Sequence, residues 1–257
     1  MKTNWKLFII LLIMSIIGIV AVIPYSLTLQ GGLPADLPVP LYVLLIAQIG
    51  QNIVLFAILI WVGLFVSKKI GFGLPIIEGW LEGKEVKSYF KSILGISIGL
   101  GILVGILIVG FDALFSIMGV TLSTVSSNQV NPPAWQGFLA SFYGGINEEI
   151  SMRLFLMSIF VWIFYKIKKT SEGKPTKIGV WLAIIITAVL FGIGHLPITS
   201  AITAITPGII LRAIVLNGIG GVIFGWLYWK KGLESAMISH FSADIVLHVI
   251  VPLIVLI

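Results

Sequence analysis

Long apolar stretches separated by short polar segments form the main pattern of the chain. Seven of them are long enough to cross a bilayer as helices of about 20 residues, at approximately residues 7–29, 40–66, 92–118, 135–165, 178–196, 208–229 and 233–256. Backbone groups inside a bilayer must pair within the protein, so such stretches are expected to be helical. The pattern predicts an all-α fold, a polytopic membrane helical bundle of about seven transmembrane helices, in a single integral membrane domain over residues 1–257.

Two polar or glycine-rich regions refine this prediction. The segment from Ser67 to Tyr89 combines glycines, a tryptophan and several charges, which indicates either a short amphipathic helix on the inner membrane surface or a solvated linker. If that helix were embedded in the membrane, the count would rise to eight. The third span has two Gly-x-x-x-Gly spacings that favour close helix packing, at Gly95, Gly99, Gly101 and Gly105.

The lysines are distributed so that they indicate a topology. They lie before the first span and in the even-numbered loops, and the odd-numbered loops contain none. The fourteen positions are Lys2, Lys6, Lys68, Lys69, Lys84, Lys87, Lys91, Lys166, Lys168, Lys169, Lys174, Lys177, Lys230 and Lys231. The positive-inside rule then predicts a multi-pass protein of the cell membrane with its N-terminus in the cytoplasm and its C-terminus outside.

Composition narrows the chemistry and the partners. The hydrophobic fraction of 58% exceeds the roughly 45–50% of soluble domains. The absence of cysteine excludes disulfides, thiolate zinc sites and cysteine nucleophiles. The net charge of +6 follows from the loop lysines, so the expected partner is the lipid bilayer and no nucleic acid is predicted. The first span exceeds the 7–15 residues typical of a signal-peptide core and is expected to be retained; the oligomeric state is left open.

The fourth span contains an unusual cluster of charges, Glu148, Glu149 and Arg153. Each ionised group at the centre of a membrane helix costs roughly 2.5–3.5 kcal/mol on insertion scales, so such groups are rarely without a function. Residues four apart share a helix face, which predicts an ion pair between Glu149 and Arg153. Glu148 points away from the arginine and is the better candidate for a general base.

The three histidines all lie in apolar segments. His195 ends the fifth span, while His240, Asp244 and His248 follow one another at intervals of four on one face of the last span. Three spans that each carry glutamate, histidine or aspartate predict a shared polar site, in which Glu148, Glu149, His195, His240 and Asp244 are the catalytic candidates and His248 is the weakest member.

Two hydrolytic chemistries fit these residues. In the first, a carboxylate and an imidazole remove a proton from water, and a second imidazole stabilises the oxyanion formed on an attacked carbonyl. In the second, Glu148, His195 and His240 are the ligands of a zinc ion, or of another divalent metal, with water in the fourth position. The metalloprotease motif His-Glu-x-x-His and the aspartyl motif Gly-x-Gly-Asp are absent from the sequence. Gly-x-Ser-x-Gly occurs at Gly95–Gly99, inside the third apolar span and not at the strand-to-helix turn that a serine hydrolase requires.

Functions of other classes are alternatives. A proton-coupled transporter could use the intramembrane acids and histidines together with Asp112 as a proton relay, and Arg212 as an anion site. No internal repeat of the kind that marks many transporters is evident. A non-catalytic membrane scaffold or a bacteriocin-immunity factor is the third alternative.

Three ordered motifs carry a resemblance to a known family. They are Glu-Glu-x-x-x-Arg at Glu148, Glu149 and Arg153, Phe-x-x-x-His at Phe191 and His195, and His-x-x-x-Asp at His240 and Asp244. Residues 135–250, the motif-bearing catalytic core, thereby resemble the CPBP intramembrane proteases, which include CaaX prenyl endoproteases and bacteriocin-processing (Abi) proteins. The resemblance implies an intramembrane endopeptidase that hydrolyses peptide bonds of a membrane-embedded or membrane-proximal peptide or protein substrate, CaaX-prenylated substrates included.

The resemblance also implies roles for the motif residues. Glu148 and His195 would activate water, Glu149 with Arg153 would hold the helix, and His240 with position 244 would bind the oxyanion or a metal. Members of the family are described both as metalloproteases and as metal-independent glutamate proteases, so the cofactor stays open.

One position departs from the pattern of the prenyl endoproteases. They tend to have asparagine where this chain has Asp244, and an ionised carboxylate can only accept a hydrogen bond. The difference favours the broader prokaryotic branch of the family over prenylated CaaX substrates.

In a bundle of straight helices, the site residues would lie at membrane depths too different for a shared site. At about 1.5 Å per residue from the cytoplasmic boundaries, His240 lies roughly 10 Å deep and His195 roughly 26 Å deep. Either the fourth and fifth spans protrude into the cytoplasm, or the loop before the last span dips into the bundle.

Overall fold

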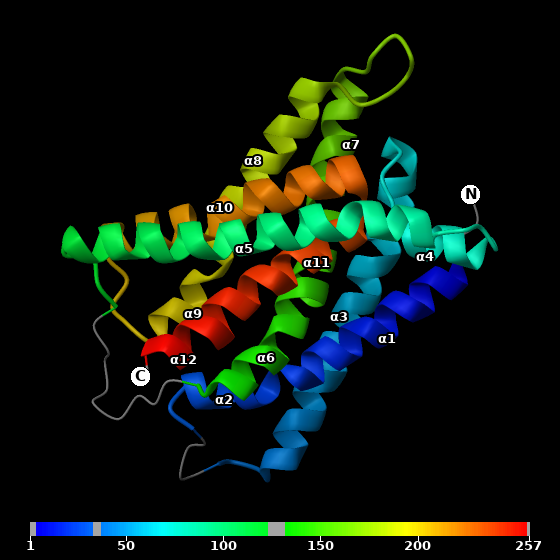
Figure 1. Cartoon of the computed structure of the whole chain (residues 1–257). Coiled ribbons are helices and arrows are strands. Elements are labelled where there is room, and N and C mark those ends of the chain that lie inside the picture. Colours follow the sequence, from blue (N-terminus) through cyan, green and yellow to red (C-terminus); the bar gives the residue numbers. More distant parts are fainter. Residues whose placement is uncertain (1–3, 33–36, 123–131, 256–257) are drawn as a thin grey trace.

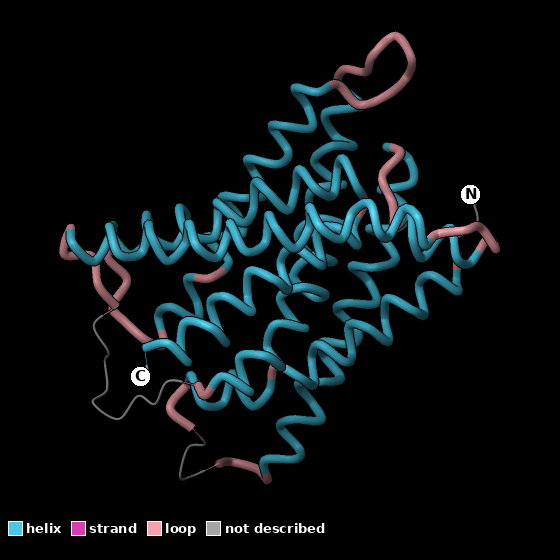
Figure 2. Tube along the Cα trace, in the orientation of Figure 1, coloured by secondary structure: helices cyan, strands magenta, loops and turns pink. Residues whose placement is uncertain are grey.

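A computed structural model of the chain describes residues 4–32, 37–122 and 132–255, and these residues form helices joined by loops, with one isolated bridge between Lys169 and Pro175 (Figures 1 and 2). The elements in chain order are α1 (Trp5–Ala21), α2 (Ile23–Leu29), α3 (Leu41–Ile70), α4 (Pro75–Leu81), α5 (Lys87–Ile117), α6 (Ala134–Phe142), the π-helical η1 (Tyr143–Glu148) and η2 (Ile150–Met157), α7 (Ser158–Ile167), α8 (Lys177–Gly194), α9 (Leu196–Ser200), α10 (Pro207–Lys231), α11 (Leu233–Asp244), the π-helical η3 (Ile245–Ile250) and α12 (Val251–Val255).

Within the described ranges, seven helical runs are long and apolar enough to cross a membrane. They are Trp5–Leu29, Leu41–Ile70, Lys87–Ile117, Ala134–Ile167, Lys177–Ser200, Pro207–Lys231 and Leu233–Ile254. These runs correspond one to one with the seven apolar stretches of the sequence. The prediction of an all-α, multi-pass membrane bundle is confirmed.

The polar segment before the third span forms the short helix α4. Gly71 ends α3 with a left-handed backbone (φ 75°), and Pro75 occupies the first turn of α4. A helix of 7 residues is only about 10 Å long and cannot cross a bilayer, so the count of spans stays at seven. Of the two alternatives for this segment, a short helix or a linker, the structure has the short helix, at Pro75–Leu81.

Contacts with α4 bury the turn between the last two spans. The backbone N–H groups of Ile76 and Ile77 each donate to Glu234 Oε1 at 3.0 Å, and Leu233 N–H donates to the Gly73 carbonyl at 3.1 Å. Leu233 is fully buried as a result. The start of α11 is thus covered by a helix, while the ends of α7 and α8 and the loop between them extend beyond the neighbouring helices (Figure 1), so both alternatives for the depth of the site stay open.

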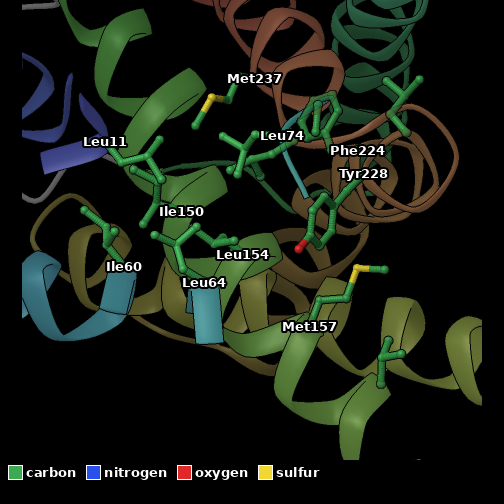
Figure 3. Packing of buried hydrophobic residues seen from close by; sticks show 14 of the residues in the cluster. Leu11, Ile60, Leu64, Leu74, Ile150, Leu154, Met157, Phe224, Tyr228 and Met237 are labelled. Atoms are coloured by element: carbon green, nitrogen blue, oxygen red, sulfur yellow. The ribbon is translucent and has the colours of Figure 1, made fainter. Parts of the chain in front are cut away.

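The hydrophobic core lies mainly in the half of the bundle that is next to the lysine-bearing loops. Figure 3 shows part of this cluster, in which side chains from the N-terminal halves of α1 and α11 meet the C-terminal halves of α3 and α10. Its fully buried members include Leu11, Ile60, Leu74, Ile150, Leu154, Met157, Val161, Ala183, Ile184, Leu227 and Leu233. Burial of this apolar area holds the helices together at one end of the bundle, and the cavity described below lies nearer the other end.

Two of the four glycines of the third span make close helix contacts. A Cβ at Gly101 would overlap the Ser239 carbonyl oxygen, and a Cβ at Gly105 would lie 2.7 Å from Val246 Cβ. Nothing lies within 4 Å of a Cβ built at Gly95 or Gly99. The packing prediction therefore holds for Gly101 and Gly105, which let α5 approach α11, and does not hold for the first pair.

Replacement of Gly101 by alanine should destabilise the bundle. The added methyl group cannot move away from backbone atoms of α11, and overpacking of this kind costs about 1–3 kcal/mol. Thermal unfolding of the purified protein in detergent should show a lower midpoint for Gly101→Ala. The matched control Gly99→Ala, on the same helix with open space around it, should unfold like the wild type; equal midpoints for the two variants would contradict this packing.

Candidate active site

A buried ion pair lies at the centre of the predicted site. Glu149 is fully buried, and its Oε1 lies 3.0 Å from Arg153 Nη1. The residues belong to the fourth span, where η1 and η2 make this stretch π-helical and not α-helical as assumed from the sequence. Such wider turns occur frequently at functional sites. The i,i+4 pair forms despite the change of helix type.

Aromatic rings surround the arginine of this pair. The Arg153 guanidinium carbon lies 5.0 Å from the centroid of the Phe191 ring and 5.4 Å from that of the Phe224 ring. Its Nη2 also donates to the Gly221 carbonyl at 3.4 Å. A buried cation over the faces of two aromatic rings is stabilised by both rings, which compensates part of the cost of burial.

His240 is held in one orientation by the same glutamate. Its Nδ1 lies 2.7 Å from Glu149 Oε1, and its ring stacks on Phe224 with centroids 4.6 Å apart and planes inclined by 20°. Its other nitrogen, Nε2, lies 3.7 Å from Glu148 Oε2 and 3.7 Å from Asp244 Oδ1. The ring therefore presents Nε2 to both remaining carboxylates.

His195 is fixed by the end of its own helix. It caps α8, and its Nδ1 lies 2.8 Å from the Phe191 carbonyl oxygen. A carbonyl oxygen only accepts, so Nδ1 carries the proton and, in the neutral ring, Nε2 keeps a free lone pair. The edge of the ring meets Phe191 at a centroid distance of 4.8 Å. The half-buried imidazole is thus set up as an acceptor.

These side chains line one cavity of about 410 Å³. Its wall includes Glu148, His195, His240, Asp244 and His248, so the structure brings four of the five predicted catalytic residues to one space. Glu149 lies behind His240. His248 is joined to the site through Asp244, whose Oδ1 is 3.9 Å from His248 Nε2.

Three aromatic side chains of the site were missed from the sequence. Tyr25 and Tyr143 line the cavity, and the Tyr25 hydroxyl lies 3.2 Å from His248 Nδ1. Phe224 stacks on His240. The sequence offered a signal for two of them, because Tyr143 lies five residues before Glu148 and Phe224 belongs to an unusual Gly-rich, aromatic stretch of the sixth span. Nothing in the sequence distinguishes Tyr25.

Asp112 and Arg212, the further residues required by a proton relay, lie outside the cavity wall. Arg212 Nη2 is 2.6 Å from Asp112 Oδ1, and Arg212 Nε donates to the same oxygen at 2.7 Å. The two charges neutralise each other between α5 and α10. Neither residue lines the cavity, so the cavity wall does not connect this pair to the histidines.

The prediction of zinc ligands at Glu148, His195 and His240 stays open. Among the described residues, no three His, Cys, Asp or Glu side chains are grouped so that they could hold an ion. His240 and His195 each bond through Nδ1 to an oxygen of the chain, as metal-bound imidazoles commonly do, and Nε2 of each ring faces the cavity. The chemistry proposed below is written with the side chains of the chain alone, and zinc stays an alternative for direct measurement.

Comparison with known proteins gives one family. The family model described as "Type II CAAX prenyl endopeptidase Rce1-like" matches residues 130–246. Neither curated proteins nor solved structures gave a match. The matched segment contains all three motifs that carried the resemblance in the sequence, and it ends before His248. Residues 130–246, a little under half of the chain, are thus similar to the Rce1-like type II CAAX prenyl endopeptidases.

Proposed function

We propose that the chain is an intramembrane endopeptidase that cleaves membrane-embedded or membrane-proximal peptides with water activated by Glu148 and His195. The observation that supports this most strongly is that Glu148, His195 and the Nε2 of His240 line one cavity, with His240 anchored from behind by Glu149. The family match to endopeptidases is consistent with hydrolysis of a peptide bond.

Glu148 is the general base in this proposal. Its carboxylate is partly exposed to the cavity, with 25% of the side chain accessible, whereas Glu149 is committed to an arginine and a histidine. Glu148 takes a proton from water as the water oxygen bonds to the peptide carbonyl carbon, and it returns that proton to the leaving nitrogen as the carbon–nitrogen bond breaks. The Nε2 lone pair of His195 orients the water.

His240 stabilises the oxyanion in this proposal. In its doubly protonated form the ring donates from Nδ1 to Glu149, and its Nε2–H points into the cavity. A donor fixed in advance in a site without bulk water stabilises developing negative charge more than a mobile group does. Arg153 supports this role indirectly, because its ion pair holds the Glu149 carboxylate in place.

Asp244 bears on the choice of substrate. Its Oδ1 lies 3.7 Å from His240 Nε2, where it can orient the imidazolium but, when ionised, cannot donate to an oxyanion. We therefore propose membrane peptides in general as substrates, with prenylated CaaX proteins as the narrower alternative that the family description suggests. The topology that we propose has the N-terminus in the cytoplasm and the C-terminus outside.

Substitution of Glu148 by glutamine should abolish cleavage without loss of folding. The change removes the base but preserves shape, and general-base catalysis contributes about 10²–10⁴-fold to a rate. Cleavage of a mixture of hydrophobic peptides in detergent, read by mass spectrometry, should fall by that factor while the unfolding midpoint stays within a degree or two. A variant with undiminished cleavage would contradict the role of Glu148, and Glu85→Gln on the exposed surface is the matched control.

Substitution of Glu149 by glutamine should instead reduce the stability of the fold. Removal of one partner of a buried pair leaves Arg153 as an uncompensated buried charge, at a cost of about 3–5 kcal/mol. The amount of folded protein and its unfolding midpoint in detergent should fall well below those of Glu148→Gln. Equal stability of the two variants would show that Arg153 finds compensation elsewhere.

Removal of metal should leave cleavage intact. The proposed chemistry uses only protein side chains, so prolonged treatment with a strong chelator should not reduce the rate more than about twofold. Elemental analysis of the purified protein, wild type beside His195→Ala, supplies the independent readout. Stoichiometric zinc that disappears together with activity in His195→Ala would establish the metallohydrolase alternative.

A further inference from the structure

Two polar residues of the cavity wall have no part in the proposed reaction. Tyr25 belongs to α2 and His248 to η3, and both side chains are half-buried. Both residues also lie outside the segment 130–246 that matches the family model. An ionisable side chain inside a membrane-spanning segment is rarely without a function, because its burial there is costly. A role for this pair would extend the site beyond the matched segment.

His248 is held in place through its ring and through its backbone. The Tyr25 hydroxyl oxygen lies 3.2 Å from His248 Nδ1, and the two rings meet edge to face with their centroids 5.4 Å apart. A Cβ at Gly137 would overlap the His248 carbonyl oxygen, so α6 packs directly against η3 at this residue. The direction of the imidazole is therefore fixed by neighbours from two other helices.

The second ring nitrogen of His248 faces the carboxylate of Asp244. His248 Nε2 lies 3.9 Å from Asp244 Oδ1, and the same oxygen lies 3.7 Å from His240 Nε2. Both distances are longer than a hydrogen bond, and catalytic contacts of this length often shorten only when a substrate is bound. One carboxylate oxygen is thus shared between two imidazoles.

These contacts determine where the His248 ring carries its proton. A lone pair on Nε2 would face a carboxylate oxygen, and two acceptors repel each other, so Nε2 carries a proton. In the neutral ring Nδ1 is then an acceptor. The Tyr25 O–H is placed to donate to Nδ1. Tyr25 therefore selects the tautomer of His248 that donates toward Asp244.

A donor at His248 reduces the demand that Asp244 makes on His240. In the proposed reaction the Nε2–H of His240 stabilises the oxyanion, yet an ionised Asp244 attracts the same N–H. A carboxylate oxygen accepts more than one hydrogen bond. An N–H from His248 neutralises part of the charge on that oxygen, so the Nε2–H of His240 is left more available to the substrate.

We infer that Tyr25 and His248 are positioning residues of the reaction: Tyr25 orients His248, and His248 donates to Asp244 so that the Nε2–H of His240 stays directed at the substrate carbonyl oxygen. The effect on the rate rests on the proposed endopeptidase function. The arrangement of Tyr25, His248 and Asp244 follows from their contacts alone. Because the pair acts through other residues, its loss should lower kcat and leave KM nearly unchanged.

Kinetics of peptide cleavage in detergent test the role of the His248 N–H. His248→Phe keeps a ring but removes both nitrogens, and should lower kcat about tenfold while KM stays within about twofold. His248→Gln keeps an N–H donor and should retain about a third of the wild-type kcat or more. Loss of activity that is equal in the two variants would overturn the role of the N–H.

Removal of the tyrosine hydroxyl tests whether Tyr25 acts through His248. Tyr25→Phe should lower kcat about threefold, and the double variant Tyr25→Phe/His248→Phe should stay within about twofold of His248→Phe alone. Effects that multiply in the double variant would show that Tyr25 acts independently, against the inference. Tyr42→Phe is the matched control, because Tyr42 is exposed on α3 and lies outside the cavity wall.

Nitrogen NMR tests the arrangement without any assay of activity. The chain has three histidines, so isotope labelling of the imidazole nitrogens gives three sets of signals, and the set that disappears in His248→Phe belongs to His248. If that variant does not fold, His248→Gln makes the same assignment. The His248 ring should carry its proton on Nε2, and Tyr25→Phe should shift its Nδ1 signal. A lone pair on His248 Nε2, or signals that do not respond to Tyr25→Phe, overturns the inference.

The outcomes separate this inference from the proposed function. Glu148-dependent cleavage that His248→Phe and Tyr25→Phe do not slow, or slow only through KM, overturns the positioning role and leaves the endopeptidase standing. Absence of any Glu148-dependent cleavage removes the proposed function and the effect on the rate with it, while the NMR signals still decide how Tyr25, His248 and Asp244 are arranged.

Discussion

The buried pair of Glu149 and Arg153 is the interaction on which the geometry of the site depends. Two charges that are removed from water must remain together, and this requirement fixes everything that contacts them. Phe191 of α8 and Phe224 of α10 lie against the guanidinium, and His240 of α11 donates to the carboxylate. The pair therefore holds four separate spans in register. The positions of the reactive groups follow from this arrangement more than from the rigidity of any single helix.

A second constraint divides the bundle into two halves. Fully buried aliphatic residues such as Leu154 and Leu227 fill the half next to the lysines, and α4 covers the start of α11 there. Dense packing in that half leaves no space for a substrate. The polar cavity lies beyond this core, so the burial that stabilises the fold and the space that holds the polar side chains are in different parts of the bundle.

Local features of the sequence were sufficient to predict the seven spans and the ion pair of Glu149 and Arg153. Hydropathy depends only on neighbouring residues, and the spacing of Glu149 and Arg153 predicts contact on one helix face. The π-helical turns and the place of Tyr25 in the cavity wall were not predictable, because they depend on how α2, η1 and η3 meet in space. Depth counting assumed that α11 begins at the membrane boundary, and the sequence did not show that its first turn lies beneath α4, in contacts made by Glu234.

The proposed reaction keeps the charge around His240 nearly constant. Before attack, the negative charge is on Glu148, 3.7 Å from His240 Nε2. As Glu148 takes the proton of the water, that charge moves to the carbonyl oxygen, which occupies the same cavity and faces the same N–H. Little reorganisation of the surroundings is then required, which is the condition under which fixed dipoles and charges lower a barrier most. Asp244, at the same distance from Nε2, does not change protonation in this scheme. Its role is to hold the imidazolium while the charge moves from one partner to the other.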